Sequence, residues 1–168
     1  MKNLILPLLT LIVSVVSAQK IIKTEKVTDH STHVIGNNFE GVIFSDKEIS
    51  GFLFTKGNKK FTPTENDIIK AERLTTLSLD TIKDVTNQKV YIKRHLKKYL
   101  RQYFGYINEN GERIISINFF FWNTSDNKSG KRWLNEAIDV SDGGNRYWQI
   151  KINLTTQESF DFYINGEA

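Results

Sequence analysis

The second half of the chain alternates between apolar and polar residues with a period of two. This alternation is typical of strands that bury one face, and it predicts strands over 102–107, 113–122, 147–154 and 160–165. The segment 108–111 contains Asn and Gly, which accept positive φ, and it predicts a hairpin turn between the first two strands. A second turn is expected over 142–145. The segment 133–140 fits a strand or a short helix, and we favour a strand.

A period of 3.6 residues precedes these strands and predicts two helices. The first begins at Thr64, because Pro63 precedes it and Thr64 forms a capping box with Asp67. It continues to about Leu79, and its apolar side consists of Ile68, Ile69, Ala71, Leu74 and Leu77. The second helix spans about 86–100, and its apolar side consists of Ile92, Leu96, Tyr99 and Leu100.

Nearer the N-terminus, short apolar runs at 41–45 and 51–55 predict a further hairpin. The polar segment 19–33 predicts either a flexible lead-in or a loosely held edge strand. Two helices ahead of a meander predict an α+β fold, in which an antiparallel β-meander carries both helices on one face. We expect one such domain over 34–168. This two-layer arrangement resembles cystatin-like and related inhibitor-like folds, which is a likeness of architecture alone.

The segment 1–18 has the three-part form of an export signal. Lys2 supplies a positive start, 4–16 is almost entirely apolar, and the positions before Gln19 fit a signal-peptidase site, so cleavage is expected after Ala18. The apolar run is shorter than the ~20 residues that a spanning helix requires. We therefore expect a signal peptide and a secreted or periplasmic protein.

The chain contains no Cys. A bacterial lipoprotein needs a Cys at its cleavage site to carry the lipid, so we expect a released protein and not a lipoprotein. Disulfides are excluded for the same reason, and a small exported domain without them must be held by its core alone.

The net positive charge of the chain, +4, is concentrated in one place. Six of the 23 Lys and Arg residues lie between Lys89 and Arg101, with no acidic residue among them. The side of the second helix opposite its apolar side consists of Lys93, Arg94, Lys97, Lys98 and Arg101. Such a face is either simply solvated or binds an anionic partner, such as lipopolysaccharide, an acidic glycan, a membrane surface or nucleic acid. The export signal argues against nucleic acid.

A second candidate surface is the sheet face that points away from the helices. If the strands alternate as predicted, amide side chains lie there among aromatic rings, and the rings are Phe120, Trp122, Tyr147 and Tyr163. Rings among amides are typical of faces that bind sugars or peptides. The alternative is that the N-terminal hairpin covers this face and makes it a second small core.

The chain carries no motif that identifies a catalytic or metal site. His30 and His33 have a spacing that can chelate zinc, but no further Cys or His is placed to complete the site. The segment 123–130 resembles the start of a calcium loop, but Lys128 stands where the loop requires glycine. There is no Gly-x-Ser-x-Gly motif and no Cys nucleophile. We expect no catalytic residue, no metal and no cofactor.

Two stretches resemble small secreted proteins of Bacteroidetes-type bacteria. They are the run Arg-Gln-Tyr-Phe-Gly-Tyr-Ile-Asn at 101–108 with Gly111, and the run 142–153 with Asn165 and Gly166. That group has no assigned activity, so the resemblance implies a source and a compartment only.

Taken together, these features predict a secreted or periplasmic, non-enzymatic binding module. It would act through the basic helix or the aromatic sheet face, on an anionic envelope glycan or lipid surface or on a protein. The alternative is a small periplasmic hydrolase, because paired carboxylates are brought together in space and leave no local motif. A third reading is an envelope-associated structural protein whose basic helix contacts anionic surfaces.

Overall fold

This computed structural model describes residues 19–48, 58–81, 87–121 and 131–166. The strands in these ranges form one mixed β-sheet. Within those ranges the sheet has eight strands. Seven follow the order β1-β2-β3-β5-β6-β7-β8, and the eighth, β4, pairs with β5. Their bounds are β1 Ile21–Lys26, β2 Ser31–Gly36, β3 Glu40–Phe44, β4 Lys59–Phe61, β5 Leu100–Ile107, β6 Arg113–Phe120, β7 Tyr147–Asn153 and β8 Glu158–Ile164.

The sheet is antiparallel except at its centre. β3 pairs with the first half of β5 in parallel, and β4 pairs with the second half of β5 in antiparallel register. A parallel pair requires a crossover connection, and here both helices lie in the chain between β3 and β5. The predicted meander is therefore confirmed for β5–β8, and the predicted α+β class is confirmed for the chain as described.

The first helix, α1 (Glu65–Thr81), begins where its capping box predicts. The backbone N–H of Thr64 donates to Asp67 Oδ2 at 2.9 Å, and that of Asp67 donates to Thr64 Oγ1 at 3.3 Å. Arg113 on β6 adds an ion pair to the same carboxylate at 2.8 Å. Burial by itself raises the pKa of Asp67, but the hydrogen bonds from Thr64 and Arg113 outweigh it and leave the pKa below its usual 3.8.

Replacing Asp67 with Asn is expected to lower the free energy of unfolding by about 1–2 kcal/mol near pH 7. Because the folded pKa is lowered, this contribution is present above 3.8 and is lost as the pH falls through the folded value. Urea unfolding of both proteins at about pH 7 and about pH 2 checks this, since the two stabilities should converge in acid. Glu65→Gln, in the same helical turn and exposed, is the control and should cost far less. An Asp67→Asn deficit that persists undiminished in acid would contradict the assignment.

The second helix is shorter than predicted. α2 (Asn87–His95) continues as one 3-10 turn, η1 (Leu96–Lys98), and the backbone becomes extended at Tyr99, with φ −75° and ψ 140°. The Tyr99 hydroxyl donates to the carbonyl of Asn145 at 2.6 Å, and its ring stacks on Phe121 at 4.1 Å. Pairing of β5 with β3 and β6 starts at Leu100. Long-range contacts therefore end the helix before the residues that its periodicity includes.

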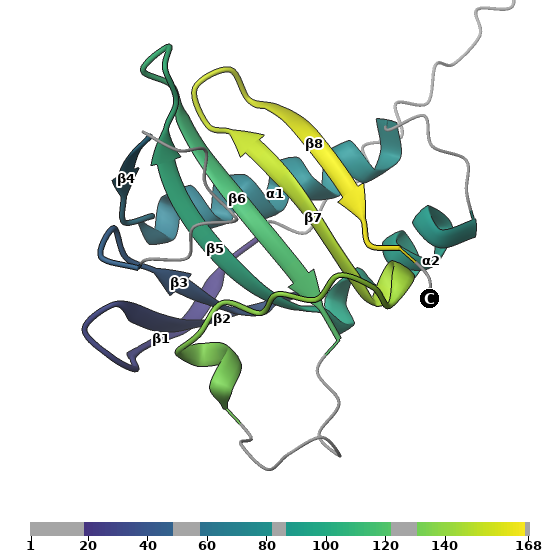
Figure 1. Ribbon diagram of the computed structural model, residues 1–168, viewed down its shortest axis with the longest axis horizontal. Helices are drawn as coiled ribbons and strands as arrows, with labels where there is room; N and C mark the ends of the chain where they lie inside the picture. The colour runs from purple at the N-terminus through teal and green to yellow at the C-terminus, as the bar shows by residue number, and fades with distance from the viewer. Residues whose placement is uncertain (1–18, 49–57, 82–86, 122–130, 167–168) are drawn as a thin grey trace, which may run out of the picture.

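The main core lies between the sheet and α1, which crosses one face of the sheet (Figure 1). Phe119 on β6 and Trp148 on β7 stack at its centre, with ring centroids 3.7 Å apart. The side of β6 and β7 predicted to face the helices is confirmed, since it consists of the fully buried residues Ile115, Ile117, Phe119, Trp148, Ile150 and Ile152. The prediction that only one face is buried is wrong for β6, where both faces are buried. On α1, Ile68, Ala71 and Leu74 are buried as expected, but Leu77 is exposed.

The opposite face of the sheet is crossed by the segment 131–142 (Figure 1). A 3-10 turn, η3 (Arg132–Leu134), begins it, and a second one, η4 (Gly144–Arg146), follows the positive-φ residue Gly143. The strand favoured over 133–140 is wrong. Trp133, Leu134 and Ile138 instead pack on the sheet as a second core with Val42, Phe44, Phe104 and Phe120.

The N-terminal segment 19–33 is not separate from the domain. It forms β1 and the start of β2, so the boundary expected at residue 34 falls inside a strand. β1 is the edge strand of the sheet, which agrees with the second reading of that segment. The predicted run at 51–55 and the export signal at 1–18 lie outside the described residues. No helix within those residues is long and apolar enough to cross a membrane.

Candidate functional site

A cleft of about 480 Å³ lies between α1 and the α2–η1 segment. This volume is within the usual range of ligand sites in proteins. Its walls come from α1, α2, η1, the start of β5 and the two ends of the β1–β2 hairpin. The lining residues are Gln19, Asn38, Glu72, Thr76, Leu79, Lys93, Arg94, His95, Leu96, Lys97, Lys98 and Arg101.

The rim of the cleft is strongly cationic. Lys93 and Arg94 belong to the last turn of α2, and Lys97 and Lys98 belong to η1; all four side chains are exposed. Lys93 pairs with Asp80 of α1, across the cleft. Among the described residues, no acidic side chain forms an ion pair with any of the other three rim cations. The structure therefore brings together four of the five basic residues predicted as a binding face.

The fifth predicted residue, Arg101, is not part of the rim. It lies on β5, only 1% exposed, and its Nε donates to Oε1 of the equally buried Glu72 at 3.2 Å. Its two other nitrogens donate to the carbonyls of Leu96 and Tyr99. The prediction of an exposed Arg101 is wrong because the helix ends before it, and strand geometry then turns its side chain towards the core. Arg101 instead holds the end of η1 against the floor of the cleft.

Glu72 connects this floor to the core. Its Oε1 also accepts a hydrogen bond from the Tyr103 hydroxyl at 2.9 Å. Burial, and then the nearby Glu72 carboxylate, raise the pKa of Tyr103 well above its usual value, so this hydroxyl stays a donor. Sequence reasoning missed Glu72, although a signal was available. It lies four residues after Ile68 on the buried side of α1, and a carboxylate there requires a buried cationic partner.

The lower walls of the cleft are uncharged. Leu79 on α1 and Leu96 on η1 line the cleft from the two helical segments. Thr76 completes the α1 side, with its hydroxyl hydrogen-bonded to the Glu72 carbonyl at 3.0 Å. The cleft is thus amphipathic, with a cationic rim, apolar walls and a floor whose charges are paired.

The aromatic face expected on the outside of the sheet is largely occupied. Phe120 is fully buried beneath the segment 131–142, and Tyr147 packs half-buried against the same second core. Trp122 lies outside the described residues. Among the three that the structure describes, only Tyr163 is exposed, at 57%. Within the described residues the cover is the chain's own segment 131–142. The second small core that the alternative reading expected is present, and Phe44 of the predicted N-terminal hairpin belongs to it, while 51–55 lies outside the described residues.

Amide side chains hold this cover in place. Gln102 Nε2 donates to the carbonyls of Trp133 and Glu136, both at 2.7 Å, and its Oε1 accepts from the Ile138 N–H at 2.8 Å. Asn118 Nδ2 donates to the Ile138 carbonyl at 2.7 Å. Asn118, one of the amides expected on the aromatic face, is therefore bonded to the backbone of the same chain.

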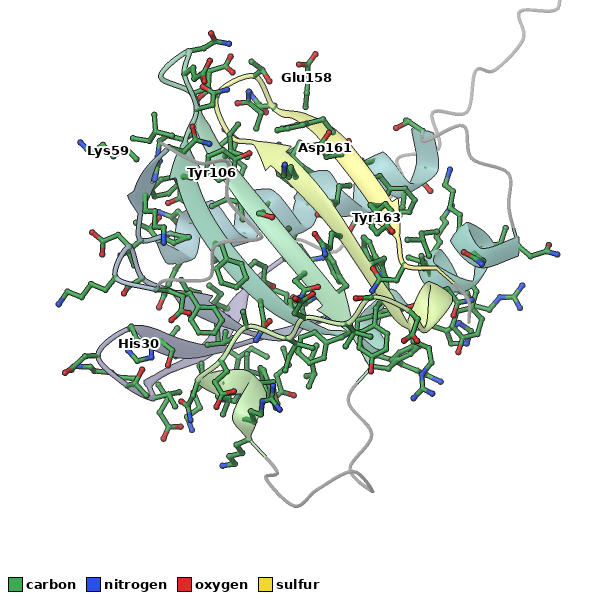
Figure 2. The ribbon with its side chains drawn as sticks, in the orientation of Figure 1. His30, Lys59, Tyr106, Glu158, Asp161 and Tyr163 are labelled. Atoms are coloured by element: carbon green, nitrogen blue, oxygen red, sulfur yellow. The ribbon has the colours of Figure 1, made fainter. Side chains whose placement is uncertain are left out.

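The uncovered part of the outer face lies between β5 and β8. Figure 2 shows Tyr106 on β5 and Asp161 and Tyr163 on β8. Asp161 has φ 49° at a bulge in β8, and its carboxylate pairs with Lys151 at 2.8 Å. The bulge shifts Phe160 into register with Lys151, away from the buried position expected from alternation. A shallow hollow of about 290 Å³ lies here, and two of its charged residues, Lys151 and Asp161, already pair with each other.

The two histidines considered for zinc do not form a joint site. His33 Nε2 lies 3.0 Å from Glu40 Oε1, and His30, at the β1–β2 turn, lies 3.9 Å from Glu48 (Figure 2). The described part of the chain contains no group of three or more potential metal ligands. The carboxyl groups with a shifted pKa there, Glu25, Asp29 and Asp67, all have it lowered.

Comparison with known proteins adds no relative: no family model, no curated protein and no solved structure matches this chain.

Proposed function

We propose that this protein is a secreted or periplasmic, non-enzymatic binding protein that holds an anionic component of the bacterial envelope in the cleft between α1 and η1. The observation that carries the proposal is the concentration of cations on the rim of this one cleft. Arg94, Lys97 and Lys98 line it together, and no acidic partner for them exists among the described residues.

Several other cations of the protein form ion pairs with nearby acids; examples are Lys23, Lys26, Arg113, Arg132 and Lys151. Lys47, Lys59 and Lys131 form none with the described residues, but none of the three lines the cleft. Holding unpaired like charges close together costs a few tenths of a kcal/mol per pair. A bound anion would reverse that cost, because each Lys or Arg near an anionic surface contributes about 1 kcal/mol. The grouping of three such cations around one cleft therefore favours a binding role for the rim over a merely solvated helix face.

The compartment narrows the class of anion. The features of 1–18 indicate export, and Gln19, the residue expected to follow the cleavage site, lines the cleft. An exported bacterial protein meets lipid phosphates and acidic glycans in the envelope. The resemblance of 101–111 and 142–166 to small secreted bacterial proteins points to the same surroundings.

Binding of the purified protein to lipopolysaccharide at low salt tests the proposal. Replacing Arg94, Lys97 and Lys98 together with Gln should weaken binding roughly 100-fold, since three cations at about 1 kcal/mol each amount to about 3 kcal/mol. Added salt should weaken the wild-type interaction in the same direction. Fluorescence anisotropy of labelled lipopolysaccharide measures both effects.

A matched triple variant provides the control. Lys23, Lys26 and Lys47 are exposed and do not line the cleft, so replacing them with Gln removes the same net charge from elsewhere. This control should bind within a few-fold of wild type. Equal losses in both triple variants would mean that only net charge matters, and equal retention in both would reject the cleft as the site.

A further inference from the structure

We infer that the ligand of the cleft is an amphipathic anion, namely an alkyl chain that ends in a phosphate or carboxylate group. The inference rests on the proposed function and adds the chemical class and the orientation of the ligand. The apolar part would lie between α1 and η1, and the charged group would lie at the rim.

The apolar residues of the cleft favour a ligand with an apolar part. Beside polar residues, the apolar residues Leu79 from α1 and Leu96 from η1 line the cleft. Leu79 is 1% exposed, so it forms a fixed base, whereas Leu96 is only partly covered by the rest of the protein. A free inorganic anion would gain no binding free energy from these apolar residues. An alkyl chain would gain by leaving water, at about 25 cal/mol per Å² of apolar surface buried.

The paired charges of Arg101 and Glu72 on the floor of the cleft determine the orientation of the ligand. Each guanidinium nitrogen of Arg101 already has a protein partner: the Glu72 carboxylate, the Leu96 carbonyl or the Tyr99 carbonyl. Arg101 thus has little capacity left to bind an incoming anion, and the Glu72 charge beside it would repel one. The exposed rim offers the opposite environment, with Arg94, Lys97 and Lys98 lacking acidic partners within the described residues. An amphipathic anion therefore fits in one direction, with its head outward and its chain inward.

A series of alkyl phosphates tests this directly. Affinity measured by calorimetry, with each compound below its micelle concentration, should rise about fourfold per added methylene, which corresponds to about 0.8 kcal/mol, until the cleft is full. Inorganic phosphate should bind far more weakly than the longer members, and alkyl carboxylates should follow the same trend in chain length. Vesicles that contain an anionic phospholipid form a separate arm, which distinguishes capture of single molecules from adsorption to a lipid surface.

Variants of the wall locate the chain. Thr76→Trp should fill the cleft and remove the dependence on chain length, whereas Asn66→Trp, exposed in the first turn of α1, should leave it unchanged. If Thr76→Trp does not fold, Leu96→Ser serves instead, because it should flatten the dependence, with Leu96→Met retaining it. Circular dichroism and urea midpoints confirm that the compared variants are folded.

The outcomes separate the two proposals. Equal affinity for inorganic phosphate and long alkyl phosphates, with loss in the Arg94/Lys97/Lys98 variant, would overturn the amphipathic ligand and keep the anion-binding cleft. Binding to vesicles alone would also overturn it. Affinities that no rim substitution changes would overturn the proposed function itself.

Discussion

Replacing Arg101 with Met is expected to lower the free energy of unfolding by about 3–5 kcal/mol. The substitution leaves the Glu72 carboxylate buried without its cation and frees the carbonyls of Leu96 and Tyr99 that close η1. Both members of the pair are 1% exposed, so water cannot readily replace the lost partner. Urea unfolding of the variant and the wild type measures the loss.

A double-mutant cycle separates the pair from its surroundings. Glu72→Met should also cost several kcal/mol, because it leaves Arg101 and the Tyr103 hydroxyl without their acceptor. The double variant should lose less than the sum of the two single losses, since no charge then remains unpaired. Lys97→Gln is the control from the exposed rim and should stay within about 0.5 kcal/mol of wild type. Additive losses in the cycle would show that Arg101 and Glu72 do not act as a pair.

The same variants bear on binding. Arg101 joins the floor of the cleft to η1, so its loss should weaken anion binding by misplacing Lys97 and Lys98, even though Arg101 itself lies below the rim. This expectation corrects the view of Arg101 as an exposed member of a basic helix face. A rim variant should reduce binding at unchanged stability, whereas an Arg101 variant should reduce both.

The second large effect is expected at Gln102. Its replacement by Leu removes the amide that bonds to the carbonyls of Trp133 and Glu136 and to the N–H of Ile138. These backbone groups lie over an apolar core and each costs about 1–3 kcal/mol if left unpaired. We expect a total loss of about 3 kcal/mol, limited by the ease with which the segment 131–142 can lift and hydrate its backbone.

Hydrogen exchange at the Ile138 amide checks this mechanism more directly than global unfolding. Its protection should fall in Gln102→Leu by more than that of amides in β6, because the segment opens before the sheet does. Gln149→Leu is the matched control; Gln149 is half-buried on β7, two strands away from Gln102, and has no partner in the segment 131–142. Unchanged Ile138 protection in Gln102→Leu would show that apolar packing alone holds the cover.

Local signals predicted local structure well. The capping box at Thr64 and Asp67 determines where α1 begins, since its hydrogen bonds join residues three apart. The Asn and Gly at 108–111 determine the β5–β6 turn for the same reason, and Gly111 has φ 77°. Alternation along β6 and β7 identified the side of each strand that lies in the main core, because strand geometry places every second side chain on one side.

Long-range contacts overruled the local pattern in three places. The 3.6-residue period continues through Arg101, but pairing with β3 and β6 converts Leu100 and Arg101 into strand. The segment 133–140 has the composition of a strand, but Gln102 and Asn118 bind its backbone, and no strand of the described residues pairs with it. At β8, the bulge at Asp161 changes the register and moves Phe160 out of its expected place.

The sequence by itself determined the α+β class, the start of α1, the hairpin turns and the presence of concentrated positive charge before β5, because each depends on neighbours in the chain. Only the tertiary structure decided which of those charges face solvent. It turned Arg101 inward to Glu72, 29 residues away, and left Arg94, Lys97 and Lys98 around a cleft. The physical reason is that an ion pair and a cleft are properties of distance in space, and this fold brings together side chains from α1, η1 and β5 that no sequence period connects.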